Sequence, residues 1–235
     1  HMDNGTDVFG SIEAVGALTG GARVNGLNVD GQPNTMTTGG DIADPPDFPD
    51  DDLAAAKVTN NNATGIIPPA GMNINQIYDP VNKRLFCNSN NKTITLRPGV
   101  YFFTQVLLTG NSAKVQISPA GEAKIYIETV NPGDLAMHIN NNGTLNPAGA
   151  PGNMEILIKQ GRVWWENAGQ IRCPVFAPNS DIDADNAFDL FGSIVCKTID
   201  ISGGGTFIYD EALGNPSPAQ TGIRVLAWLE ITPLE

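Results

Sequence analysis

Three carboxylates stand at alternate positions in the C-terminal half of the chain. Asp181, Asp183 and Asp185 are separated by one Ile and one Ala. Alternate residues of a β-strand share a face, so a strand here would present all three carboxylates outward together. Carboxylates at this density repel one another, and a hard cation such as Ca²⁺ would relieve the repulsion. These three residues are therefore candidate calcium ligands.

The match of this run to a known calcium loop is incomplete. An EF-hand loop needs Gly at its sixth position and Glu at its twelfth, where this sequence has Asn186 and Gly192. Arg162 is expected to lie over Asp181 and to offset its charge. We therefore expect a solvated acidic face, and calcium binding is the alternative.

A second acidic cluster lies in the Pro-rich stretch DIADPPDFPDDD, from residue 41 to residue 52. Asp50, Asp51 and Asp52 end this stretch, and a Pro-rich loop can wrap such oxygen ligands around calcium. The simpler interpretation is again a solvated charge run. Residues 53–58 (LAAAKV) favour a short helix, because acidic residues before a helix stabilise its N-terminus.

Adjacent tryptophans give the strongest aromatic signal in the sequence. In a strand, one of Trp164 and Trp165 points inward and the other outward. Trp165 shares its column with Ala184 and Gly203, and these small residues would make room for an inward Trp165. An outward Trp164 could stack against a sugar ring or a protein partner, and the alternative is that a loop covers it.

Nothing in the sequence forms a recognisable catalytic constellation. His138 is flanked by apolar residues, which is typical of a structural His. General acid–base chemistry needs a partnered group, and no partner is evident. A nucleophile elbow, a phosphate loop and a His-rich zinc motif are all absent from the sequence. We expect a protein that is not an enzyme, with no cofactor other than calcium in the alternatives above.

Composition excludes two classes of partner. The formal net charge is −12, with 13 Lys and Arg against 25 Asp and Glu, so nucleic acid and anionic membrane surfaces are poor partners. No apolar run is long enough to span a bilayer. The first two and last two residues resemble cloning remnants, so we expect any membrane anchor of the parent protein to have been removed. Three Cys with no metal-type spacing do not indicate a compartment.

A shift of about 19 residues aligns three segments, which begin near residues 154, 173 and 192. Like residues then fall into columns, which predicts parallel strands stacked coil on coil in a β-solenoid, with a β-sandwich as the alternative. The apolar columns are Ile156, Val175 and Ile194; Ile158, Ala177 and Cys196; Val163, Ile182 and Ile201; and Ile171, Leu190 and Tyr209. The remaining columns are Arg162, Asp181 and Asp200; Trp164, Asp183 and Ser202; Trp165, Ala184 and Gly203; Phe188 and Phe207; and, at a corner, Asn167, Asn186 and Gly205.

Four motifs carry a resemblance to a known family: LRPGVYF at 96–102, VFAPNS at 175–180, FGSIVCK at 191–197 and IYDEAL at 208–213. They resemble a bacterial domain of unknown function that lies downstream of a PilX-type segment in pilus-assembly-like proteins. That domain is similar in style to bactofilins and to right-handed parallel β-helix surface proteins. The resemblance covers about residues 93–213 and implies a right-handed helix, a position at the cell surface and an N-terminal membrane helix outside this chain.

The whole chain is thus predicted to be one all-β domain, from residue 3 to residue 233. We expect a loop-rich N-terminal section with an acidic insertion at about 32–92, regular coils at about 93–213, and a last strand or cap at 214–233. The predicted function is an extracellular structural or adhesive module of a pilus or secretion assembly, which presents loops and a flat face to a protein partner or a glycan. The alternatives are a calcium-dependent, polysaccharide-active β-helix enzyme that uses Asp181, Asp183 and Arg162, and a bactofilin-like polymer.

Overall fold

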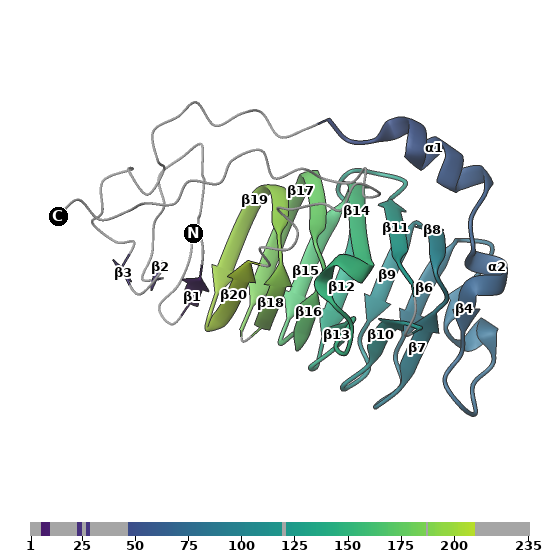
Figure 1. Ribbon diagram of the computed structural model, residues 1–235, viewed down its shortest axis with the longest axis horizontal. Coiled ribbons are helices and arrows are strands. Elements are labelled where there is room, and N and C mark those ends of the chain that lie inside the picture. Colours follow the sequence, from purple (N-terminus) through teal and green to yellow (C-terminus); the bar gives the residue numbers. More distant parts are fainter. Residues whose placement is uncertain are drawn as a thin grey trace.

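The computed structural model describes residues 6–9, 23–24, 27–28, 47–118, 121–186 and 188–209. Two sequence predictions lie outside these residues: the part of the acidic insertion from residue 32 to residue 46, and the last strand or cap at 214–233. Most of the described chain is β-structure, in curled and mostly parallel sheets (Figure 1). The all-β class is therefore confirmed.

Two ten-stranded sheets account for the described strands. The first sheet contains, in spatial order, β3 (Leu27–Asn28), β2 (Arg23–Val24), β1 (Thr6–Phe9), β20 (Gly205–Tyr209), β18 (Phe188–Gly192), β16 (Gln170–Arg172), β13 (Thr144–Leu145), β10 (Lys114–Ile117), β7 (Thr93–Leu96) and β4 (Ile66–Ile67). The second contains β5 (Tyr78–Asp79), β6 (Arg84–Cys87), β9 (Gln105–Leu108), β12 (Leu135–Asn140), β15 (Arg162–Glu166), β17 (Val175–Asp185), β14 (Met154–Gln160), β11 (Ala123–Glu128) and β8 (Gly99–Phe103), with β19 (Ile194–Ser202) beside β17.

The chain passes between the two sheets repeatedly, so that strands far apart in sequence become neighbours. Pairing is parallel throughout the described strands except for β2 with β3, β4 with β7, and β5 with β6. The long strand β17 pairs with β14 through its first part and with β15 through its second part. The strands of the second sheet therefore form two parallel rows, which meet in β17 and β19.

The predicted 19-residue register holds over part of the C-terminal half. Ile156 pairs with Val175 and Val175 with Ile194, as expected. Val163 likewise pairs with Ile182, and Ile171 with Leu190. The column principle is therefore confirmed across β14, β15, β16, β17 and β18.

The register changes by two residues between β17 and β19. Ala177 pairs with Cys196, but the next pair joins Asp181 to Thr198, because three residues of β17 stand against Lys197 alone. Every predicted column that crosses this bulge toward the C-terminus is therefore wrong at its last member. The observed continuations pair Ile182 with Ile199, Asp183 with Asp200, Ala184 with Ile201, Phe188 with Gly205 and Leu190 with Phe207.

A polar corner runs beside the strands, close to where the sequence indicated one. Asn167 and Asn186 both adopt left-handed backbone conformations, with φ of 48° and 64°, which Asn tolerates better than most residues. Each donates its backbone N–H to the adjoining turn, Asn167 to Asp185 and Asn186 to Ser202. Gly203, with φ of 86°, lies against Asn186 in the next coil, so the predicted Gly205 is two residues too late.

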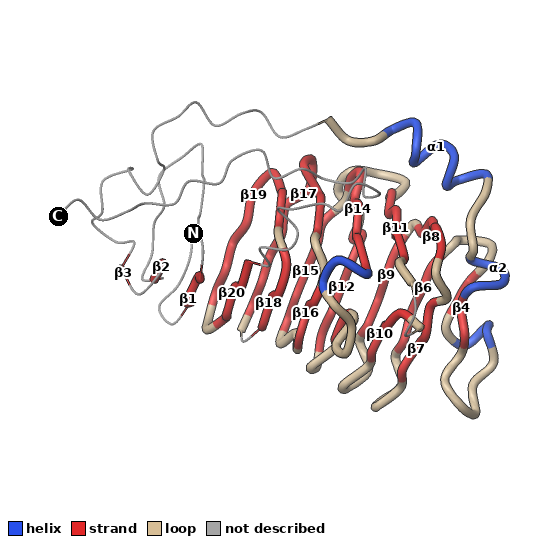
Figure 2. The backbone as a smooth tube through the Cα atoms, in the orientation of Figure 1, coloured by secondary structure: helices blue, strands red, loops and turns tan. Residues whose placement is uncertain are grey.

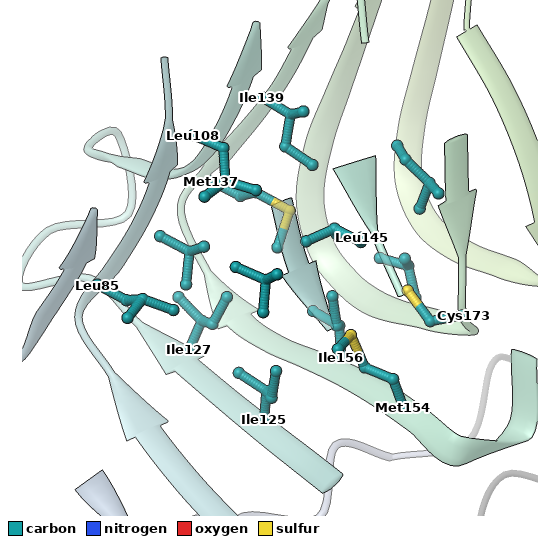
Figure 3. Packing of buried hydrophobic residues seen from close by; sticks show 14 of the residues in the cluster. Leu85, Leu108, Ile125, Ile127, Met137, Ile139, Leu145, Met154, Ile156 and Cys173 are labelled. Carbon is teal, nitrogen blue, oxygen red and sulfur yellow. The ribbon is translucent and has the colours of Figure 1, made fainter. Parts of the chain in front are cut away.

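Apolar side chains from both sheets fill the interior. Figure 3 shows Leu108, Met137, Ile139, Ile125, Ile127 and Ile156 converging between the strands. Trp165 is fully buried among them, as predicted. Burial of the Trp165 indole ring removes a large apolar area from water, so this residue contributes strongly to the stability of the stacked strands.

Helix α1 (Asp50–Val58) covers part of the outer surface of the second sheet (Figure 2). Its first turn carries three Asp residues, as the predicted helix at 53–58 requires. Phe48, Leu53 and Ala56 pack on a second apolar cluster formed by Phe102, Tyr126, Leu157 and Phe176. The short helix α2 (Asn62–Gly65) and the 3₁₀ turns η2 (Ile74–Gln76) and η3 (Pro151–Asn153) complete the described elements.

Candidate functional site

The other row of the second sheet presents a face that no described helix covers. Its strands are β6, β9, β12, β15 and the second parts of β17 and β19. Registered pairing lines up one outward residue from each strand, in the order Phe86, Leu107, His138, Trp164, Asp183 and Asp200. This series, called the open ladder below, is aromatic or apolar at one end and acidic at the other.

Trp164 and His138 form the centre of the open ladder. Their rings stack with centroids 4.6 Å apart and planes 4° from parallel. Trp164 also donates its indole N–H to Asp185 Oδ2 at 2.9 Å. The Trp164 ring is half-buried and held from two sides, so it is a rigid platform and not a fully exposed ring.

The Glu166 carboxylate lies between the side chains of His138 and Asn140. Asn140 donates its side-chain N–H to Glu166 Oε2 at 3.0 Å, and His138 Nε2 lies 3.6 Å from the same oxygen. His138 Nε2 is buried and has no hydrogen-bond partner among the described residues. The stack with Trp164 fixes the orientation of the His138 ring.

The three predicted calcium ligands do lie on one outward face, but each carboxylate has its own partner. Asp183 accepts a bond of 2.8 Å from Arg162, in place of the predicted Arg162–Asp181 contact. Asp181 accepts a bond of 2.5 Å from the Thr198 hydroxyl. Asp185 accepts bonds from Trp164 and, at 2.6 Å, from the Ser202 hydroxyl.

These partners account for the acidic face without a cation. In the part of the chain that the structure describes, no three His, Cys, Asp or Glu side chains are grouped so as to hold a metal ion. The face also influences a neighbouring thiol: burial, aided by the Asp181 carboxylate, raises the pKa of Cys196 to about 12. Cys196 is therefore a poor nucleophile at neutral pH.

The second set of predicted ligands belongs to the start of α1. Lys159 lies 2.8 Å from Asp50, and Tyr126 donates its hydroxyl to Asp52 at 3.4 Å. Asp50, Asp51 and Asp52 therefore stand at the helix N-terminus, where two of them contact the underlying sheet. Their contacts tie α1 to β11 and β14.

Sequence reasoning missed a cavity at the far end of the open ladder, because residues 32–92 were interpreted as a loop-rich insertion. It has a volume of about 380 Å³ and is lined by Asn75, Tyr78, Asp79, Pro80, Arg84 and Phe86. The alternation in Arg84–Cys87 was the available signal, since it places Arg84 and Phe86 on one face of β6.

Comparison with known proteins gives one match. Residues 105–216 match the model of a family described as a domain of unknown function (DUF7305). No curated protein and no solved structure matches the chain. In the described residues, no helix is long and apolar enough to cross a membrane.

Proposed function

We propose that the chain is a structural module of the bacterial cell surface, wound as a right-handed parallel β-helix, that presents its open ladder to a protein partner in a pilus or secretion assembly. The observation that carries this proposal is the Trp164–His138 stack on a registered parallel sheet. An aromatic platform fixed by a 4° stack and an Asp185 hydrogen bond loses little entropy when a partner packs on it. The family match supports the module and adds no activity to it.

The acidic face supports a non-enzymatic role better than the calcium-dependent alternative. A polysaccharide-active site of that kind needs carboxylates free for calcium and a free basic residue. Here Arg162 is engaged with Asp183, while Thr198 and Ser202 occupy Asp181 and Asp185. A calcium-supplemented panel of acidic glycans, followed at 235 nm for unsaturated product, separates the two hypotheses, because any product formation lost in Asp183→Ala contradicts the structural role.

The polymer alternative finds no support at the end of the stack that bears β4 and β5. These strands have two residues each and pair antiparallel with β7 and β6. Short edge strands that run against the parallel direction offer a poor template for another copy. Light scattering of the purified chain at increasing concentration should therefore show a monomer.

The cell-surface role can be tested with bacteria that carry the full-length gene. An antibody against the described coils should bind intact cells, and sheared surface filaments should contain the protein. Trp164→Ala should reduce its amount in the filaments, whereas Arg97→Met, an exposed change on the first sheet, should not. Binding of the antibody only after lysis would overturn the proposal.

A further inference from the structure

The cavity beside β6 is a separate feature from the Trp164–His138 platform. It lies where the β5–β6 hairpin meets η2, and it is lined by three rings, one amide, one carboxylate and one guanidinium. Phe86 belongs both to the cavity wall and to the first position of the open ladder. A ligand held in the cavity would therefore lie at one end of the flat outer face.

Arg84 is the unusual residue of this cavity. Its Nε atom is buried and has no hydrogen-bond partner. None of the ion pairs found among the described residues includes Arg84. A buried N–H donor without a partner is costly unless an acceptor joins it, because it has lost its hydration.

Asp79 stands directly opposite Arg84 in the hairpin and its charge acts on Arg84, but the two side chains form no hydrogen bond or ion pair with each other. Its Oδ1 accepts the backbone N–H groups of Val81 and Asn82 at 3.0 and 3.1 Å, and its Oδ2 accepts the Asn82 side chain. The Asn82 bonds lower the pKa of Asp79, so this carboxylate is ionised and committed to its own turn. The Arg84 guanidinium remains available to an external carboxylate.

The remaining walls favour a ring-shaped ligand. Pro80 and Phe86 supply apolar surfaces, and Asn75 supplies one amide. Tyr78 reaches the cavity only with its 7% exposed part, because its ring packs in the core and its hydroxyl accepts a bond from Asn62. Aromatic and prolyl faces pack against the flat faces of sugar rings, and a guanidinium binds a carboxylate through two parallel bonds.

We propose that this cavity binds a uronic acid residue of an acidic glycan, with the sugar carboxylate on Arg84 and the sugar ring against Phe86. A peptide C-terminus is the less suitable carboxylate, because such termini are captured by free backbone N–H groups. The N–H groups of the nearby turn, at Val81 and Asn82, are already bound to Asp79. The inference rests on the proposed function in one respect, which is that a protein at the cell surface would meet a glycan there.

Calorimetric titration of the purified chain tests the proposal, with trigalacturonate as the probe and a neutral galactose trisaccharide as its counterpart. The acidic probe should bind at least tenfold more tightly than the neutral one, and added salt should weaken it. Arg84→Met, which keeps the apolar stem, should lower affinity for the acidic probe at least tenfold. Arg97→Met, an exposed arginine outside the cavity, should leave affinity unchanged.

A second variant protects the test against misfolding of Arg84→Met, which a melting curve would reveal. Phe86→Leu should weaken both probes severalfold while it preserves the preference for the acidic one. Equal binding of the two probes, unchanged affinity in a folded Arg84→Met protein, no binding of trigalacturonate at millimolar concentration, or tighter binding of a tetrapeptide with a free C-terminus would each overturn the proposal. These outcomes concern the cavity alone, whereas antibody access on intact cells tests the cell-surface role.

Discussion

Two ladders divide the outer face of the second sheet, and they differ in what lies over them. Under α1, the covered ladder runs through Phe102, Tyr126, Leu157 and Phe176, which are at most 5% exposed. The open ladder on the neighbouring row includes Trp164 and Asp183, which remain half-buried. Both ladders cross β17, so one strand carries Phe176 under the helix and Asp183 in the open.

The comparison shows that outward position alone does not determine exposure. Phe48, which stands 128 residues earlier in the chain, covers Phe176, because the two rings stack with centroids 6.0 Å apart. Nothing described lies over Asp183, which pairs with Arg162 instead. The covered ladder therefore serves stability, and the open ladder is available to a partner.

The largest effect is expected from a charge placed beneath both ladders. Ile182→Asp would bury an unpaired carboxylate at a fully buried position, which costs more than about 4 kcal/mol. That loss is comparable with the whole stability of a typical domain, so the parallel stack should unfold. Circular dichroism melting should show no cooperative transition, whereas Asp183→Ser, one residue away, should melt within a few degrees of wild type. A wild-type melt for Ile182→Asp would contradict its inward position.

Truncation of one aromatic residue in each ladder measures the difference between them directly. Phe176→Ala should cost about 3–5 kcal/mol, because it opens a cavity under Phe48. Trp164→Ala should cost about 1–2 kcal/mol, since it removes one ring stack and one hydrogen bond at a half-exposed position. Urea unfolding of the two variants gives both values, and equal losses would remove the distinction between the ladders.

High pH should weaken the covered ladder through Tyr126. Burial, together with the Asp52 and Glu155 carboxylates, raises the pKa of Tyr126 above its ordinary value of about 10. A raised pKa in the folded state means that Tyr126 contributes fully to stability below pH about 10 and loses that contribution as the pH rises further. Unfolding by urea between pH 9 and pH 11 should show this decline. Tyr126→Phe should be less sensitive over the same interval, and an unchanged slope in that variant would exclude Tyr126 as the cause.

The smallest effect is expected from the ion pairs at the rim of each ladder. Lys159→Met removes the contact with Asp50 and the cation over the Phe48 ring, and it should cost less than about 1 kcal/mol. Lys197→Met on the open side should cost less still, since its amine lies 3.8 Å from Asp181 and both groups are largely exposed. The difference in melting temperature between the Lys159 variant and wild type should be smaller in high salt than in low salt, because salt screens the ion pair. A larger loss for the Lys197 variant would reverse the order expected of the two sides.

Periodicity in the sequence was sufficient to predict the parallel columns and the inward Trp165. It failed at the two-residue bulge of β17, because Pro178, Asn179 and Ser180 alternate as plausibly as any strand residues. Alternation records only which face a residue occupies and cannot reveal an added pair of residues, which restores the same face. All the wrong columns follow from this one cause.

The candidate site was predictable only in part, because its partners come from distant coils. Alternation placed Asp181, Asp183 and Asp185 together, but it could not show that Thr198 and Ser202 would bond to two of them after the register change. The cavity at Arg84 also required the antiparallel pairing of β6 with β5, which has only two residues and produces no pattern. Such local contacts depend on how loops return to the sheet and not on the repeat.

The corners of this molecule differ in length while its ladders stay in register. Leu145 pairs with Ile171 but Leu190 pairs with Phe207, so successive turns of chain take 26 residues in one place and 17 in another. Much of the surplus lies between β13 and β14, where the Asn146 side chain donates to Ala150 and Arg172 and closes the loop on itself. A foreign peptide inserted into this loop beyond the Asn146 closure should therefore leave the strands undisturbed, so the stack should tolerate an insertion there without a change in its pairing.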